Sequence, residues 1–262
     1  MTTHQERFYV APNGIKIHYL EHGKSGANVL LIPGITTPAI LWEFVAERLG
    51  DYARVFSIDN RGRGLSDQRP GLGYTLDDYA ADAAGVIREL GLPPAVVLGH
   101  SMGARIGIRL AARYPDLVAR LMLADPPVSG PGRRPYPIPL QQYLDNIDMA
   151  SRGAPLPPSS IFTDKQLRLR SEWMATCSKE AVIATHRNFH EEDIFADLPR
   201  IRCPTLLLYA GQGGTVLDSD ADELVAGIAN AEKLKLEKVG HMMPWFDLEL
   251  FLQSIKGFIS EV

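Results

Sequence analysis

Short, uninterrupted apolar runs recur along this chain and alternate with segments of helical periodicity. The apolar runs cover residues 29–32, 55–58, 95–98, 121–124, 205–209 and 233–239. The segments with apolar residues at helical spacing cover 41–49, 79–90, 102–114, 221–228 and 248–259. Strands that are apolar throughout are typical of a parallel sheet covered on both faces. The alternation therefore predicts an α/β fold with a doubly wound, mostly parallel sheet.

Local signals refine this prediction near the N-terminus. Residues 7–10 and 15–20 have strand-like patterns and are joined by a segment containing Asn13 and Gly14, so we expect a hairpin there. The hairpin brings the expected sheet to eight strands. Thr75 and Asp78 have the spacing of a capping box, which predicts the start of the helix before residues 79–90.

The alternation is interrupted between Pro126 and Pro199. This stretch has no buried-strand run, begins rich in proline, and then shows helical periodicity at 140–151 and 164–187. We interpret it as a helical lid of about residues 126–199, inserted after the sixth strand. The whole chain, 1–262, would then be a single domain with a core of residues 1–125 and 200–262. A separate α-helical domain is the alternative.

Charge and cysteine content exclude several classes of protein. The chain has 27 basic and 31 acidic residues, a net charge of −4, which argues against nucleic acid or an anionic membrane as a partner. Two cysteines are too few for a disulfide scaffold and lack metal-ligand spacing. The N-terminus has no apolar signal region, and no run approaches about 18 apolar residues. We expect a cytoplasmic protein.

A motif for nucleophilic catalysis follows the apolar run at 95–98. It reads Gly99-His100-Ser101-Met102-Gly103 and leads directly into the segment 102–114 with helical spacing. In this context G-x-S-x-G predicts a sharp strand-to-helix turn that exposes the serine hydroxyl above the sheet edge. The helix N-terminus behind it would favour negative charge on a reacting oxygen. Ser101 is the candidate nucleophile.

Together with the segments 59–66 and 239–241, this motif resembles the α/β-hydrolase family over almost the whole chain. The resemblance implies an oxyanion hole made of two backbone N–H groups, those of Ile35 and Met102. Pro33 stands where the family usually has histidine, but a backbone donor at Ile35 does not depend on that side chain. The resemblance also implies that the base lies between the last strand and the last helix. Of seven histidines only His241 does so, and His190 is the alternative.

The position of the acid departs from the family pattern. The family usually places it just after the seventh strand, where this chain has Gly214. Asp125, at the end of the sixth strand, is the favoured replacement, because catalytic groups collect at the carboxyl ends of such strands. Asp218 is the alternative, although its surroundings suggest the start of a helix. A site without a catalytic acid is the third alternative. The expected triad is Ser101, Asp125 and His241, with no metal and no cofactor.

The substrate depends on the lid, which carries Arg133, Arg134, Tyr136, Tyr143, Trp173, His186, Arg187 and His190. An anionic small molecule would find a partner there, but the substrate-binding residue stays unknown, as does the oligomeric state. Arg105 is expected to form a structural ion pair, and a position on the floor of the substrate pocket is the alternative.

The segments 99–103 and 123–136 and the glycines at 213–214 are similar to the formate-releasing amidases of bacterial nicotinate breakdown. This resemblance implies cleavage of a C–N amide bond, N-formylmaleamate giving formate and maleamate. A carboxylesterase or a C–C bond hydrolase of ring-cleavage products is the alternative. A ligand-binding receptor is the alternative outside enzymes.

Overall fold

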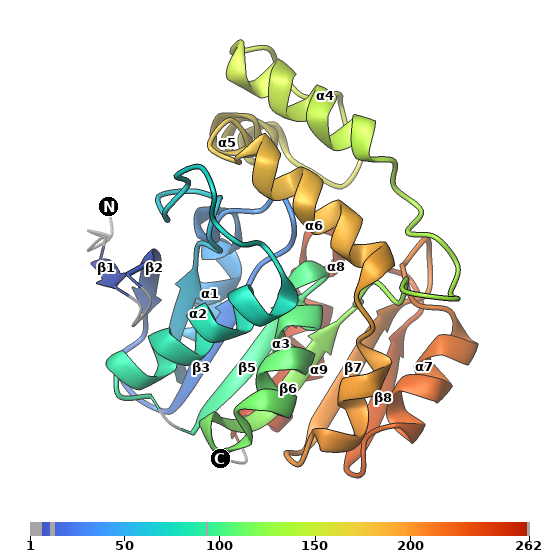
Figure 1. The fold of residues 1–262 in the computed structure, drawn as a ribbon. Helices are drawn as coiled ribbons and strands as arrows, with labels where there is room; N and C mark the ends of the chain where they lie inside the picture. Colours follow the sequence, from blue (N-terminus) through green and yellow to red (C-terminus); the bar gives the residue numbers. More distant parts are fainter. Residues whose placement is uncertain (1–6, 11–13, 93, 261–262) are drawn as a thin grey trace.

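A computed structural model describes residues 7–10, 14–92 and 94–260 of the chain (Figure 1). One sheet holds the eight strands in the order β1-β2-β4-β3-β5-β6-β7-β8. The strands are β1 (Arg7–Val10), β2 (Lys16–His22), β3 (Ala27–Ile32), β4 (Ala53–Ile58), β5 (Ala95–His100), β6 (Val118–Ala124), β7 (Thr205–Ala210) and β8 (Ala231–Leu236). β1 and β2 pair in antiparallel fashion, as does β2 with β4, and all other pairs are parallel. The predicted α/β-hydrolase fold is confirmed.

Helices cover both faces of this sheet. They are η1 (Ala39–Trp42), α1 (Glu43–Leu49), α2 (Leu76–Glu89), α3 (Met102–Arg113), η2 (Pro115–Leu117), α4 (Leu140–Ser151), α5 (Asp164–Met174), α6 (Lys179–Glu191), η3 (Phe195–Arg200), α7 (Asp218–Ala226), α8 (Met243–Phe246) and α9 (Leu248–Ser260). Successive residues of β3 enter opposite cores. Leu30 and Ile32 pack in the core that includes α2 and α3, whereas Val29 and Leu31 pack in the core that includes α1 and α9. This explains the uninterrupted apolar runs in the central parallel strands.

The segment between β6 and β7 forms three helices, α4, α5 and α6, beyond the carboxyl ends of the parallel strands (Figure 1). The prediction of one helical stretch at 164–187 is wrong in one respect, because α5 ends at Met174 and α6 begins at Lys179. Ser178 separates the two helices, since its side chain accepts a hydrogen bond from Ala181 N and its own N–H donates to Gly62 O at 2.8 Å. That this segment acts as a lid within a single domain stays a prediction.

The last strand also differs from its predicted range. β8 begins at Ala231 rather than at residue 233, because its first residues pair with β7 although Glu232 and Lys233 are exposed. A strand at the sheet edge tolerates charged side chains. Among the described residues, no helix is both long and apolar enough to span a bilayer. The cytoplasmic location stays a prediction.

Candidate active site

Ser101 lies at the sharp turn between β5 and α3, in a strained backbone conformation with φ 54° and ψ −118°. The two glycines of the motif make this turn possible. A Cβ at Gly99 would lie 2.3 Å from Gly103 O, and one at Gly103 would lie 1.8 Å from Ile32 O. Side chains at either position would collide with backbone, so the turn requires glycine. The strain at Ser101 marks a candidate functional position.

The loop after β3 lies against this serine. A Cβ at Gly34 would be 3.4 Å from Ser101 Cβ, which brings the Gly34–Ile35 peptide next to the turn. The structure gives the N–H groups of Ile35 and Met102 no protein acceptor in the part of the chain it describes. Met102 is the first residue of α3, so the positive end of the helix dipole adds to its N–H. Both donors expected for an oxyanion hole are therefore available.

Asp125 follows β6 directly and is fully buried. Its carboxylate accepts a 2.5 Å hydrogen bond from His241 Nδ1, across 116 positions of sequence. Thr215 N donates to Asp125 Oδ2 at 2.7 Å and Ala210 N donates to Oδ1 at 3.2 Å. Burial by itself raises the pKa of Asp125, but the hydrogen bond and charge of His241 and the two backbone donors together lower it below its usual value. The carboxylate is held ionised, facing the imidazole.

Gly214 explains how an acid on β6 reaches this histidine. A Cβ at Gly214 would lie 2.7 Å from Asp125 Oδ1 and 3.1 Å from Asp125 Oδ2. The carboxylate of Asp125 therefore occupies the space into which a side chain at position 214 would point. An acid after β6 and an acid after β7 would therefore place their carboxylates in the same position. In this chain Gly214, after β7, leaves room for the carboxylate of Asp125, after β6.

The alternatives for base and acid lie elsewhere. Asp218 is the first residue of α7, its side chain is 65% exposed, and it pairs with Lys235. It makes no hydrogen bond to His241 among the described residues. His190 lies in α6 against the ring of His186. The structure thus brings Asp125 and His241 together and leaves Asp218 and His190 out.

His100 packs against His241, the expected base. It is buried, and its Nε2 lies 2.9 Å from the backbone oxygen of His241, with the two rings 4.9 Å apart. Burial, followed by the charge of His241, lowers the pKa of His100 to about 3. His100 is therefore a neutral donor to His241 O.

Two residues near the site were not predicted from the sequence. Thr215 fixes Asp125, since its hydroxyl also donates to Asp125 O at 2.9 Å. Arg63 is fully buried, and its Nε donates to Ile35 O at 2.9 Å. Both interactions join segments that are far apart in the sequence, so no local pattern signals them.

Most of the arginines named from the sequence form ion pairs with carboxylates. Arg133 pairs with Glu223, Arg134 with Asp220, and Arg187 with Glu191. The expected ion pair of Arg105 is wrong. Its guanidinium instead donates to the main-chain oxygens of Pro127, Ser129, Asn188 and Glu192. The guanidinium of Arg105 is surrounded by carbonyl oxygens because the connection after β6 and the end of α6 both pack against α3, which carries Arg105.

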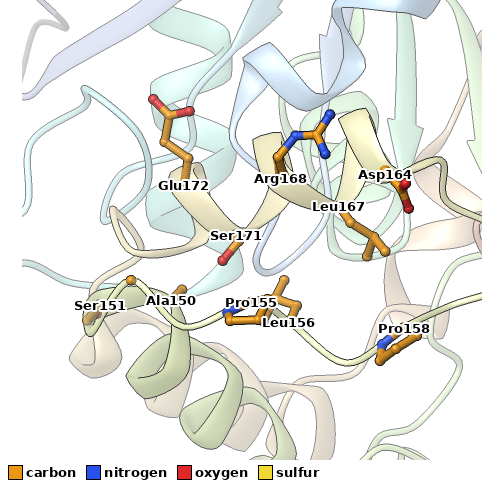
Figure 2. Close-up of a pocket in the computed structure, with 11 residues that line it drawn as sticks. Ala150, Ser151, Pro155, Leu156, Pro158, Asp164, Leu167, Arg168, Ser171 and Glu172 are labelled. Carbon is orange, nitrogen blue, oxygen red and sulfur yellow. The ribbon is translucent and has the colours of Figure 1, made fainter.

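Two other features lie apart from these reacting groups. A cavity of about 780 Å³ lies between α4 and α5, and Figure 2 shows Leu167 and Ser171 of α5 facing Pro155 and Leu156 across it. None of its lining residues belongs to the expected triad. Among the described residues, a group that could hold a metal ion comprises His22, Glu43 and Glu47, and it shares no residue with the triad.

Comparisons with known proteins identify relatives of this chain. N-formylmaleamate deformylase of Pseudomonas putida is 44% identical over 255 residues, which cover 96% of this chain and 95% of the relative. 2-(Acetamidomethylene)succinate hydrolase of Mesorhizobium japonicum is 42% identical over 111 residues, but these cover only 42% of this chain and 39% of the relative.

Two solved structures also align with nearly the whole of this chain. The N-formylmaleamic acid deformylase Nfo from another Pseudomonas putida strain has a TM-score of 0.89 and 40% identity, covering 96% of this chain and 100% of that one. E-2-(acetamidomethylene)succinate hydrolase has a TM-score of 0.79 and 25% identity, covering 98% and 99%. A family model, described as the alpha/beta hydrolase family, matches residues 29–253. The chain therefore belongs to the alpha/beta hydrolase family.

Proposed function

We propose that this protein is a serine hydrolase that cleaves a C–N amide bond, with N-formylmaleamate as its substrate and formate and maleamate as products. One observation carries the reaction type. The buried carboxylate of Asp125 is hydrogen-bonded to His241 Nδ1, next to the strained turn that presents Ser101. The substrate is inferred from the 44% identical deformylase, which aligns along nearly the whole chain.

Each of the three side chains has a distinct task in this proposal. Asp125 holds the imidazole so that Nε2 is free to accept a proton, and it stabilises the imidazolium that forms. His241 takes the hydroxyl proton of Ser101 while the serine oxygen attacks the formyl carbon. The side chain of His241 is 22% exposed, so its ring is accessible from the site.

Backbone N–H groups stabilise the negative charge that develops on the formyl oxygen. In the tetrahedral intermediate this oxygen accepts hydrogen bonds from the N–H groups of Ile35 and Met102. His241 then donates its proton to the departing amide nitrogen, and maleamate leaves. The same histidine activates water, which attacks the formyl ester on Ser101 and releases formate.

The chemistry of the substrate fits this machinery. The nitrogen of an N-formyl amide of this kind departs as an amide, which is a better leaving group than an amine. The formyl group is also the smallest acyl group, so it needs little room at Ser101, which is only 3% exposed. No metal or organic cofactor takes part in these steps.

The experiment that tests the proposal is formate release from N-formylmaleamate by the purified protein, with Ser101→Ala as the blank. Rapid release that depends on Ser101 is the expected result. Hydrolysis of aryl esters without formate release would favour a carboxylesterase on the same triad. Inactivity towards both substrates would favour a receptor that has kept the hydrolase fold.

A further inference from the structure

Arg170 lies on α5 and is partly buried, and its guanidinium has no carboxylate partner in the part of the chain that the structure describes. Its Nη1 nitrogen is buried and has no hydrogen-bond acceptor. Within the described residues, Arg170 forms no ion pair with any carboxylate. A buried guanidinium that lacks a counter-ion is unfavourable, because desolvation of the charge is not offset. The folded protein therefore contains a cationic site that a carboxylate would complete.

An aromatic layer connects this guanidinium with the catalytic histidine. Arg170 lies over the ring of Phe162 at 5.3 Å, and Phe162 contacts Trp245 with ring centroids 6.0 Å apart. Trp245 lies 6.5 Å from the ring of His100, and His100 lies 4.9 Å from that of His241. Phe162, Trp245 and His100 thus form a continuous set of ring contacts from Arg170 to His241.

A cavity of about 320 Å³ lies at this position. Arg170, Phe162 and Trp245 line it, together with Ile40 and Leu41 of η1, which closely follow the loop of Ile35. Glu43 and Glu47 also line the cavity, and no ion pair joins either of them to Arg170 among the described residues. The cavity therefore lies between α5 and the chain that leads from the proposed oxyanion hole.

The electrostatic surroundings agree with this placement. Burial lowers the pKa of Arg170, and Tyr143 and Cys177 oppose this by smaller amounts. The charge of Arg170 in turn contributes to the lowered pKa of His100, after burial and the charge of His241. The charge of Arg170 therefore affects His100, which lies beside His241, while burial makes the charged form of Arg170 itself less favourable.

Other arginines near the site use their terminal nitrogens in hydrogen bonds or ion pairs within the protein. Arg63 donates to Ile35 O, Arg61 O, Tyr79 Oη and Thr185 Oγ1. Arg105 donates to four main-chain oxygens, as described above. Arg133 and Arg134 pair with carboxylates on α7. Arg105 also keeps one nitrogen, Nε, without an acceptor, but both of its terminal nitrogens donate to the main chain. Among these arginines, Arg170 alone has a buried terminal nitrogen without an acceptor and lines the 320 Å³ cavity.

We propose that Arg170 binds the carboxylate of the substrate and selects for an anionic acyl amide. This inference rests on the proposed function, since it names the residue that recognises the maleamate end while Ser101 attacks the formyl end. The planar guanidinium presents two parallel donors, which match the two oxygens of a carboxylate. Binding the substrate supplies the counter-ion that the protein itself does not provide.

The test compares Arg170→Met and Arg170→Lys with Arg168→Met, a control on the exposed side of the same helix. Arg170→Met is expected to raise KM for N-formylmaleamate by about 10-fold to 100-fold with a smaller change in kcat. Arg170→Lys should recover part of this loss, because it keeps the charge but not the paired donors. For the neutral methyl ester of the substrate, Arg170→Met should equal the wild type.

Thermal unfolding separates substrate binding from a structural role. Removal of an unpaired buried charge should leave the Tm of Arg170→Met unchanged or raise it, whereas a structural arginine would lower it. A lowered Tm together with equal losses on the charged and neutral substrates would overturn the proposal.

Maleamate binding, measured by calorimetry, needs no turnover and therefore separates the two proposals. Weaker binding in Arg170→Met than in Arg168→Met supports the carboxylate site even if the wild type releases no formate, in which case only the deformylase function fails. Equal affinities in the wild type and Arg170→Met, or no binding by the wild type, overturn the role of Arg170.

Discussion

The carboxylate of Asp125 has the donors that orient a catalytic acid, and that of Asp218 does not. His241, Thr215 and Ala210 all donate to Asp125, whereas Asp218 is exposed beside Lys235. We expect Asp125→Ala to lower kcat by about 10⁴-fold, because the imidazole loses its orientation and its counter-charge. Asp218→Ala should retain nearly full activity. Steady-state formate release measures both variants, and near-wild-type activity in Asp125→Ala would refute the assignment.

His100 makes stability depend on pH in a defined window. Burial lowers its pKa to about 3, below the ordinary 6.5. Between these values the unfolded chain binds a proton that the folded chain excludes, so the free energy of unfolding falls as the pH falls. The slope from this group is at most about 1.4 kcal/mol per pH unit.

The variant His100→Gln isolates this contribution, because glutamine keeps an N–H donor for His241 O but does not titrate. We expect the stability difference between wild type and variant to shrink as the pH is lowered from 7 to 4.5. Urea unfolding at several pH values measures it. A difference that is independent of pH would show that His100 does not stay neutral in the fold.

At the scale of elements, the connection from β7 to α7 is shaped to admit the carboxylate of Asp125. A Cβ at Gly214 would also lie 2.8 Å from Ala210 Cβ, so the added methyl has no room to move aside. Gly214→Ala should displace the carboxylate and lower kcat at least about 10-fold, since small misplacements in a triad are costly.

The matched control for this change is Gly257→Ala on α9, where a Cβ would meet nothing within 4 Å. It should leave kcat unchanged and raise the free energy of unfolding by about 0.5–1 kcal/mol through helix propensity. Kinetics and urea unfolding on both variants provide the comparison. Wild-type kcat in Gly214→Ala would mean that the carboxylate tolerates a side chain there.

The elements that could be predicted are those with local signals. The capping box at Thr75 and Asp78 is present, and α2 begins at Leu76 beside it. The break between α5 and α6 was missed, because helical spacing continues through it in the sequence. The turn instead depends on the hydrogen bond from Ser178 N to Gly62 O, a contact made only in the folded chain.

At the scale of the whole molecule, Arg63 joins three separate parts of the structure. It bonds the loop after β3 through Ile35 O, α2 through Tyr79 Oη at 2.5 Å, and α6 through Thr185 Oγ1 at 2.9 Å. Arg63→Met should lower the free energy of unfolding by about 3 kcal/mol or more, since several buried groups lose a charged donor. Its kcat should also fall, because the donor loop loses its anchor.

Arg69→Met is the control for this prediction, because Arg69 is on the surface and its one hydrogen bond among the described residues goes to Gly14 O at 3.3 Å. It should change stability by no more than about 0.5 kcal/mol. Urea unfolding of both variants measures the difference. Equal stabilities would show that the buried network around Arg63 is not needed to hold the helical segment to the sheet.

The sequence by itself determined the architecture and the turn that carries Ser101. Apolar runs and helical spacing are periodic, and the glycines of the motif act on their immediate neighbours, so both signals are local and can be read along the chain. The position of His241 followed from its place between the last strand and the last helix.

Tertiary structure alone decided which carboxylate faces that histidine. Asp125 and Gly214 are 89 positions apart, and only the pairing of β6 with β7 puts the carboxylate of one into the space left by the other. The same holds for Arg170, whose lack of a counter-ion among the described residues depends on the side chains that pack around α5. Burial and pairing are properties of distances between remote segments, and a sequence acquires those distances only when it folds.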